Sequence, residues 1–398
     1  MVPGIRRQYN EQFTTEKYEA FINDLNQIFP GQLEFRIAET PLFIPKDFTQ
    51  KVIAACESII DVITKPDYLH QSNKAVPQNL SVPNENAYPH CIAFDFGICR
   101  NSNGEIEPQL IEMQGFPTLF AWQVLLAEMH EKHFGKPEGY SPYFNGFDRN
   151  SYIQLLNDII IADQNPENVI LLEIFPEQQK TRVDFFATES LLGIQTVCLT
   201  KLLQEGKDLY YEKEGRSIKI ERIYNRLIFD DLFQQPADIQ EKGKIFQQEL
   251  NVTWVPHPNW FYKISKFSLP FIDHPYVPKT QFLNEVDQLP ADLDNYVVKP
   301  LFSFAGQGVI IDVTKEAVQD IKDPENWILQ RKVDYAPVID TPNEPAKAEI
   351  RIFYFWPPGA KRPVAANNLS RLSKGKMVGV RYNKDKDWVG GSFCLFEQ

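Results

Sequence analysis

Apolar residues recur along this chain with two different periods, which predict a mixture of helices and strands. Three stretches place apolar residues at every third or fourth position, the spacing of an amphipathic helix: 16–29, 48–63 and 118–134. Thr118 stands at the start of the third and is expected to cap it. Apolar, β-branched runs at 90–99 and 109–114 flank a turn and predict two strands.

The middle of the chain alternates strand-like and helix-like segments. Residues 168–175, 181–193 and 194–200 follow in the order strand, helix, strand, with a glycine before the second strand. A β-α-β unit of this kind predicts a parallel sheet. Further elements are expected beyond it: a strand within 218–229 and helices at 236–250 and 259–272.

The last third of the chain is the richest in strands. Strands are expected at 295–300, 308–313, 327–333, 348–356 and 362–372. Residues 135–150 form a loop rich in glycine, tyrosine and phenylalanine, which suits either a plain linker or a lid over a substrate. The whole pattern predicts a mixed α/β (α+β) protein.

Composition narrows the class of protein. With 398 residues and 43% hydrophobic content, the chain is long enough for two or three domains. Its net charge is 41 − 53 = −12 with no basic block, which argues against a nucleic-acid partner. Five dispersed cysteines without CxxC spacing indicate the reducing cytoplasm rather than a disulfide framework, and Cys91 and Cys99, which flank an apolar run, are expected to be buried. No apolar run reaches the roughly 18 residues of a membrane span, so no membrane attachment is expected. The sequence says nothing of the oligomeric state.

Candidate chemistry begins at Lys299, which ends an apolar strand and precedes a loop with Ser303, Gly306 and Gly308. Glycines let successive backbone N–H groups turn toward phosphate oxygens. About 50 residues later, Glu349 and Arg351 stand two positions apart on one face of a strand. An acid for a metal beside a base for phosphate suits ATP chemistry. Taken singly, the loop also suits a plain turn and the Glu-x-Arg pair a surface ion pair.

The order of these features resembles the ATP-grasp ligase fold, in which two α+β lobes hold ATP between them. In "YKISKF", Lys263 and Lys266 are both candidates for the family's first lysine, and the distance from Lys266 to Lys299 fits best. The segment "ILQRKV" resembles the family's Leu-Gln-Glu-x-Val hinge, with arginine in place of the acid. The resemblance implies that Gln330, Arg331 and Val333 hold adenine.

Two further matches concern the phosphates. Glu349 and Arg351 resemble the Asp-x-Arg motif of glutathione-synthetase-like members, which supplies a magnesium ligand, with Glu for Asp. Arg371, in "NLSRLS", resembles a phosphate-binding arginine of the same family. The usual acid-x-Asn metal pair is missing after these residues.

The missing pair resembles a segment far upstream. "QLIEMQGFPTLF" is similar to the Glu-x-Asn-x-x-x-Pro-Thr segment of glutathionylspermidine synthetases, whose arrangement is circularly permuted, and "FDF" resembles their metal-binding "RFDF". The resemblance covers roughly residues 90–120 and 165–395. It implies one or two Mg²⁺ ions held by Asp95, Glu112, Gln114 and Glu349. The alternative for this group is a salt-bridged polar strand face.

The resemblance implies an ATP-grasp fold with a Rossmann-like pre-ATP-grasp substrate domain. Residues 1–150 would supply N-terminal helices and the strands with the metal ligands. Residues 151–260 would form the Rossmann-like domain, and residues 261–398 the nucleotide-binding lobes.

The implied activity is an ADP-forming carboxylate–amine ligase that uses Mg²⁺-ATP and passes through an acylphosphate. Arg351 and Arg371 would serve catalysis, and the substrates would be a small carboxylate and an amine, peptide-like ones included. Ala93 stands where the synthetases carry an arginine, and Arg100 is a candidate substitute. Arg226 and the aromatic loop are candidate walls of the substrate site. A nucleotide-binding protein that has lost catalysis and a kinase of the same fold remain as alternatives.

Overall fold

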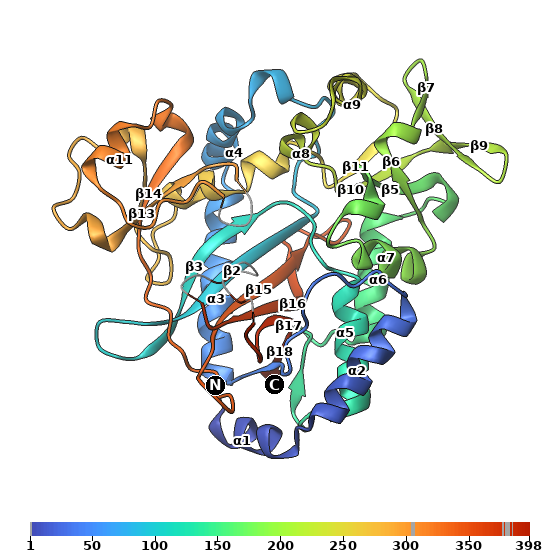
Figure 1. The fold of residues 1–398 in the computed structure, drawn as a ribbon. Coiled ribbons are helices and arrows are strands. Elements are labelled where there is room, and N and C mark those ends of the chain that lie inside the picture. Colours follow the sequence, from blue (N-terminus) through green and yellow to red (C-terminus); the bar gives the residue numbers. More distant parts are fainter. Residues whose placement is uncertain (1, 304–306, 376–377, 379–382, 384) are drawn as a thin grey trace.

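The computed structural model describes residues 2–303, 307–375, 378, 383 and 385–398, and shows a mixed α/β chain with several sheets (Figure 1). A five-stranded sheet lies in the middle. A small three-stranded sheet with α11 lies to its left in Figure 1, and a four-stranded parallel sheet to its upper right. No helix of the described residues is long and apolar enough to cross a membrane.

The central sheet joins two segments that lie some 250 positions apart in the sequence. Its order is β17-β16-β15-β2-β3, and every pairing is antiparallel. The strands are β2 (Cys91–Arg100), β3 (Ile106–Gln114), β15 (Lys347–Phe355), β16 (Val364–Ser373) and β17 (Gly390–Ser392). The predicted strands at 90–99, 109–114, 348–356 and 362–372 are therefore confirmed.

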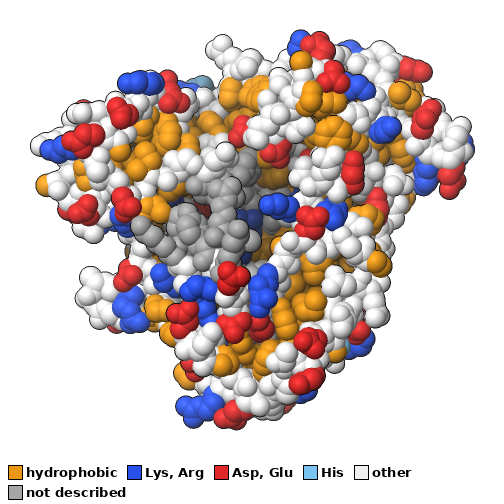
Figure 2. Space-filling model, in the orientation of Figure 1, with side chains coloured by type: hydrophobic (Ala, Val, Ile, Leu, Met, Phe, Trp, Pro, Cys, Tyr) orange, Lys and Arg blue, Asp and Glu red, His pale blue; other side chains and the backbone are white. Residues whose placement is uncertain are grey.

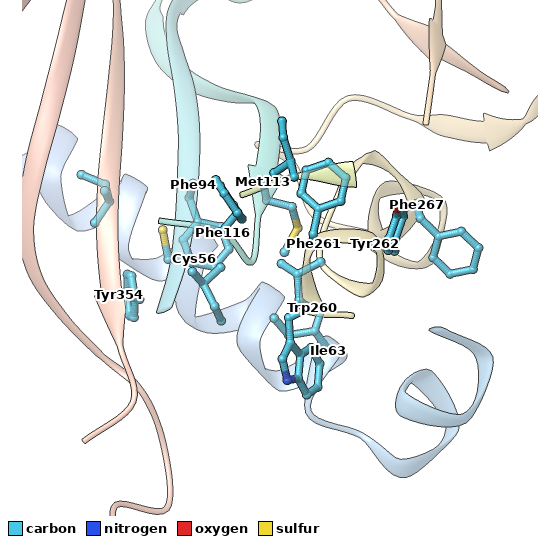
Figure 3. Packing of buried hydrophobic residues seen from close by; sticks show 14 of the residues in the cluster. Cys56, Ile63, Phe94, Met113, Phe116, Trp260, Phe261, Tyr262, Phe267 and Tyr354 are labelled. Carbon is cyan, nitrogen blue, oxygen red and sulfur yellow. The ribbon is translucent and has the colours of Figure 1, made fainter. Parts of the chain in front are cut away.

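One face of the central sheet is packed against the long helix α3 (Lys46–Ile63). Alternate residues of β2 and β15, such as Phe94 and Tyr354, are fully buried in the same cluster as Cys56 of the helix (Figure 3). Since side chains alternate across a strand, the residues between them point to the opposite face. That face is apolar at Ala93 and Phe353 but carries charged residues further along.

The predicted β-α-β unit forms a parallel sheet of order β11-β10-β5-β6. Its strands are β5 (Val169–Glu173), β6 (Gln195–Cys198), β10 (Arg222–Asn225) and β11 (Thr253–Val255). Helices α6 (Arg149–Ile160) and α7 (Val183–Leu192) contribute apolar residues to the cluster beside it. The strand order reverses between β5 and β10, so the carboxyl edge there is where a crevice is expected.

Three of the residues expected to bind the nucleotide, Lys299, Gln330 and Arg331, lie in a third sheet of order β12-β14-β13. Its strands, β12 (Thr280–Phe282), β13 (Tyr296–Pro300) and β14 (Trp327–Arg331), are antiparallel. The prediction of a strand at 308–313 is wrong, because Ile310 forms only an isolated bridge with Val298.

The helix expected over 259–272 is divided in two. Helix α10 (Trp260–Lys263) ends at the extended residue Ile264, and a 3-10 segment (Lys266–Phe271) follows. Ser265 begins the second segment, because its hydroxyl accepts the N–H of Phe267 at 3.1 Å. The break places Lys266 at the start of a new turn rather than along a continuous helix.

Other elements complete the structure. Two further sheets comprise β1 (Leu42–Ile44), β18 (Cys394–Glu397) and β4 (Tyr140–Ser141), and β7 (Leu203–Glu205), β8 (Asp208–Lys213) and β9 (Arg216–Ile220). The remaining α-helices are α1 (Pro3–Gln12), α2 (Thr15–Ile28), α4 (Pro66–Ser72), α5 (Trp122–Phe134), α8 (Phe229–Phe233), α9 (Ala237–Gly243) and α11 (Lys315–Gln319). Strands β7 and β8 and helices α1 and α6 had no counterpart among the predicted elements, whereas β9 and β10 overlap the strand region expected at 218–229.

The aromatic loop at 135–150 is tied to the sheets beside it. Its strand β4 pairs with β18, and the N–H of Phe144 donates to the carbonyl of Ala366 at 3.1 Å. The amide of Asn368 donates to the carbonyl of Pro142 at 2.8 Å. These bonds favour the linker interpretation of the loop over the lid.

Candidate functional site

The charged face of the central sheet brings together residues from strands that are distant in sequence. Asp95 on β2 lies in register with Arg351 on β15 and with Glu112 on β3. Glu349 on β15 lies in register with Arg371 on β16. Cross-strand neighbours on one face are within reach of each other's side chains. With Lys266 and Lys299, these five residues make up what we call the charged cluster.

The acids of the charged cluster are held by its arginines. Arg351 binds both carboxylate oxygens of Asp95, with Nη2 at 2.5 Å from Oδ2. Arg371 Nη2 lies 3.0 Å from Asp95 Oδ2 and 2.7 Å from Glu349 Oε2. Arg351 Nη2 is also 3.8 Å from Glu112 Oε1. Each acid is thus paired, and Asp95, whose side chain is 2% exposed, is shared by two guanidinium groups.

Two lysines approach from outside the central sheet. Lys266 Nζ lies 3.8 Å from Glu112 Oε2 and donates to the carbonyl of Ser303 at 2.8 Å. Lys299 Nζ, at the end of β13, donates to Gln330 Oε1 at 2.6 Å and to the carbonyl of Ile111 on β3 at 3.2 Å. The other candidate lysine, Lys263, is instead paired with Glu85. The structure therefore favours Lys266 over Lys263 as the member of the site.

Burial and neighbouring charges shift the pKa values of the charged cluster in different directions. Burial lowers the pKa of Lys299 to about 8. Burial acts to raise the pKa of Glu112, but Lys266 and Arg351 outweigh it and hold this pKa below its usual value. Burial raises the pKa of Glu349 despite the neighbouring Arg371. Such perturbed groups gathered in one place are typical of functional sites.

Tyr335 belongs to this site, and no sequence signal indicated it. It lies on the connection from β14 to β15, and its hydroxyl donates to Glu349 Oε1. Burial and the adjacent carboxylate raise the pKa of Tyr335, so the phenol stays protonated and donates. A lone tyrosine in a connection has no motif by which it could have been found.

The hinge candidates lie at the end of β14. The amide of Gln330, whose residue is 2% exposed, donates to Thr280 Oγ1 at 3.1 Å. The N–H of Arg331 donates to the carbonyl of Lys279 at 2.9 Å, and its guanidinium pairs with Asp292 at 3.0 Å. The N–H of Arg331 is therefore already occupied, whereas the described residues supply no partner for the N–H of Val333.

The loop after β13 is described only in part. Ser303 contributes its carbonyl to Lys266, as above. Gly308 has a φ of +74°, and a Cβ there would lie 3.1 Å from Pro300 Cγ, so a side chain at this turn would be strained. Gly306 lies outside the described residues.

The predicted magnesium ligands supply suitable atoms but not a preformed site. Asp95, Glu112 and Glu349 offer the hard oxygens that Mg²⁺ prefers. However, the part of the chain that the structure describes contains no group of three or more His, Cys, Asp or Glu side chains that could hold a metal ion. Gln114 is on the same strand as Glu112, and no hydrogen bond from a described residue fixes its amide. The donor set fits a magnesium ion chemically, but the acids as they stand are bound to arginine and lysine.

Arg226 connects the parallel sheet to the charged cluster. Its Nη1 lies 3.0 Å from Asp184 Oδ2 and donates to the carbonyl of Thr118 at 2.6 Å. The Thr118 hydroxyl in turn accepts from Arg351 Nη1 at 3.2 Å. The predicted cap of α5 by Thr118 is wrong, because Asp184 Oδ1 accepts the N–H groups of Ala121 and Trp122 at 3.0 and 2.9 Å.

The suggested replacement for the missing arginine at position 93 is not found at the site. Arg100 is exposed, and its Nη1 donates to the carbonyl of Gly104 in the turn after β2. Ala93 itself is buried in an apolar cluster with Phe120 and Phe353. Side chains alternate along β2, and Arg100 is five residues beyond Asp95, so it cannot take over the role.

The surface is hollowed near the middle of the molecule, and Lys and Arg side chains lie among Asp and Glu side chains at its edges (Figure 2). Two separate cavities of about 430 and 480 Å³ lie elsewhere, on either side of the loop at 141–147, and Tyr143 lines both. No residue of the charged cluster lines either cavity. Geometry and charge, rather than cavity size, thus identify the candidate site.

Comparisons with known proteins bear on the fold and on the class of activity. No family model matches the chain. A putative glutamate–cysteine ligase from Frankia alni is 26% identical over 212 residues, which cover 46% of this chain and 24% of that protein. The match thus spans about a quarter of the relative's length.

A solved structure resembles nearly the whole chain. It is the apo form of a glutathione synthetase-like effector from Globodera pallida, with a TM-score of 0.58 at 9% identity, covering 97% of this chain and 98% of that one. At this identity the likeness concerns the fold alone. The chain is a mixed α/β protein that shares its fold with a glutathione synthetase-like protein.

Proposed function

We propose that this chain is an ATP-grasp ligase that joins a small carboxylate to an amine, with ATP and one or two Mg²⁺ ions, and releases ADP. The observation that carries the proposal is the charged cluster, where four cations and three acids from β2, β3, β13, β15, β16 and the 266–271 turn converge. The similarity to a named ligase and to a glutathione synthetase-like fold supports the class of reaction.

The charges of the cluster suit a polyanion accompanied by a divalent cation. Lys266, Lys299, Arg351 and Arg371 would neutralise the phosphates, which is a task of positioning and electrostatics. Three acids beside four cations leave only a small positive excess. Asp95, Glu112, Gln114 and Glu349 would hold the Mg²⁺, which would offset the charge of the acids and stabilise the negative charge of the phosphates.

The proposed reaction needs no nucleophile from the protein. The substrate carboxylate oxygen attacks the γ-phosphorus, and the bond to the β-phosphate oxygen breaks, which yields an acylphosphate and ADP. The amine then attacks the acyl carbon, inorganic phosphate leaves, and the amine gives up a proton. Arg351 and Arg371 would hold the transferring phosphoryl group, and Gln330, Arg331 and Val333 would hold the adenine.

The domain division and the setting of the activity are part of the same proposal. The N-terminal helices and the strands with the metal ligands would lie in residues 1–150. The Rossmann-like substrate domain would comprise residues 151–260, and the nucleotide-binding lobes residues 261–398. The substrates are a carboxylate and an amine, peptide-like ones included, in the cytoplasm and with neither nucleic acid nor membrane as a partner.

A nucleotide-binding protein without catalysis is the second candidate, because a specific observation favours it. Ala93 lies among apolar residues, and Arg100 is too far along β2 to hold a reacting carboxylate. Such a protein would bind ATP but release no ADP with any acid and amine. A kinase of the same fold would differ again, since its product would keep the phosphate.

The deciding experiment is a screen for ADP release with pools of carboxylates and amines, followed by mass spectrometry of the product. A ligase forms a product without phosphate. Lys299→Ala and Glu112→Ala should abolish ATP turnover, whereas Lys207→Ala and Glu249→Ala, which break an exposed ion pair of the β7–β9 region, should not. Full activity of either cluster variant would exclude the proposed site.

A further inference from the structure

Tyr335 is held in place by backbone bonds on both sides. The carbonyl of Asp334 accepts the N–H of Arg100 at 2.8 Å, and the N–H of Ala336 donates to the carbonyl of Ile98 at 2.9 Å. The segment around Tyr335 therefore runs along the end of β2 like a short extra strand. Its position is fixed relative to the central sheet, although it belongs to the connection from the nucleotide-lobe sheet.

Gly97 makes room for the tyrosine ring. It is the cross-strand neighbour of Glu349, and a Cβ built on it would lie 2.8 Å from Tyr335 Cε1. The ring therefore occupies the space that a side chain at position 97 would need. A side chain at position 97 would displace the ring from the position in which the Tyr335 hydroxyl reaches Glu349 Oε1.

Glu349 lies between Tyr335 and Arg371, and Arg371 also donates to Asp95 Oδ2 at 3.0 Å. The second carboxylate oxygen of Glu349, Oε2, lies 2.7 Å from Arg371 Nη2, while Tyr335 binds the first. The Arg371 side chain is 36% exposed. The other two cations of the charged cluster that form ion pairs, Lys266 and Arg351, are 8% and 11% exposed. A long, partly exposed side chain loses rotamer freedom when it is fixed, so an orienting partner has a measurable effect on it.

We propose that Tyr335 is a positioning residue that orients Arg371, through Glu349, toward the phosphates of a nucleoside triphosphate. Gly97 provides the space for the tyrosine ring. Tyr335 follows Val333 by two residues, so one short segment links the adenine hinge to the phosphate cations. The inference rests on the proposed function, because it takes the triphosphate as the ligand of Arg371.

The test compares two ligands that share the base but differ in phosphate number. Calorimetry without added metal would measure the binding of a non-hydrolysable ATP analogue and of AMP to the full chain. Tyr335→Phe keeps the ring but loses the donor, and should weaken the ATP analogue about tenfold while leaving AMP unchanged. Gly97→Ala, which displaces the ring, should give the same pattern. The double variant should lose no more affinity for the ATP analogue than the single variant that binds it more weakly. Tyr211→Phe is the matched control, because the Tyr211 hydroxyl, on β8 of a distant sheet, donates to the carbonyl of Glu167.

The outcomes separate this inference from the proposed function. If Arg371→Ala weakens the ATP analogue but Tyr335→Phe does not, the positioning role is overturned and the nucleotide site stands. If Tyr335→Phe weakens both ligands equally, the residue is structural only and the inference also fails. If the unaltered protein binds neither ligand, the proposed function fails, and the role of Tyr335 fails with it.

Discussion

Lys299 is the residue of the charged cluster whose charge should change within an accessible pH range. Burial lowers its pKa to about 8, and only its protonated form attracts phosphate. The affinity for an ATP analogue should therefore be full below this pKa and fall as the pH rises through it. Calorimetry between about pH 7 and pH 9.5 would show the decline. A lysine with the ordinary pKa, near 10.4, would stay largely charged over this range and would show none.

A variant distinguishes this titration from a general effect of pH. Lys299→Arg keeps a charge throughout, since arginine is effectively always protonated. It should remove the decline in affinity around pH 8, even if the larger group binds more weakly overall. An unchanged decline in Lys299→Arg would assign the titration to another group.

Tyr335 and Asp184 show why single residues of the site escaped prediction. Asp184 lies on α7, yet it binds the N–H groups at the start of α5, more than 60 positions earlier. Tyr335 reaches Glu349 only because the connection runs along β2 and Gly97 leaves space. Both depend on tertiary contacts, which leave no periodic or local trace in the sequence.

At the level of elements, the start of α5 depends on a buried charge from another helix. Asp184 caps α5 and is the carboxylate partner of Arg226, and both side chains are almost fully buried. Asp184→Ala would leave a buried guanidinium without its counter-ion, so the free energy of unfolding should fall by about 3–5 kcal/mol. Denaturant unfolding would measure this, with Asp238→Ala on the exposed surface of α9 as a control expected to change little. A loss below about 1 kcal/mol would mean that water replaces the carboxylate.

Strongly periodic elements were predictable, and elements that depend on distant partners were not. Helix α3 and strands β2, β15 and β16 follow from their apolar patterns because those patterns match the faces that are buried. The predicted helix at 259–272 failed because Ser265 caps a new turn inside it. The predicted strand at 308–313 failed since an apolar run needs neighbours on which to form a ladder, and Ile310 finds only one bridge.

At the level of the whole molecule, the charged cluster exists because the central sheet pairs β2 with β15. Local patterns predicted both strands but not their pairing. Their common site was expected only from the resemblance to a permuted ligase. The candidates Asp95, Glu112, Glu349, Arg351 and Arg371 do lie together, although their roles remain proposals. The arginines bind the acids directly, which matches the salt-bridged strand face that the sequence left open as the alternative.

These internal pairs make the stability of the whole chain depend on what occupies the cluster. Asp95 is buried and shared by Arg351 and Arg371, so Asp95→Asn leaves two arginines short of a counter-ion. The free energy of unfolding should fall by about 3–5 kcal/mol. A polyanion can then replace the lost charge, so inorganic pyrophosphate should stabilise Asp95→Asn more than it stabilises the unaltered protein.

The comparison needs a surface pair that loses the same type of contact. Asp61→Asn removes one exposed partner of Arg362, and it should cost no more than about 1 kcal/mol and show no added response to pyrophosphate. Denaturant unfolding of Asp95→Asn, Asp61→Asn and the unaltered protein, each with and without pyrophosphate, gives the six values needed. If Asp95→Asn and the unaltered protein gain equally from pyrophosphate, the two arginines are not available to phosphate. The anion site would then have to lie at Lys266 and Lys299 alone.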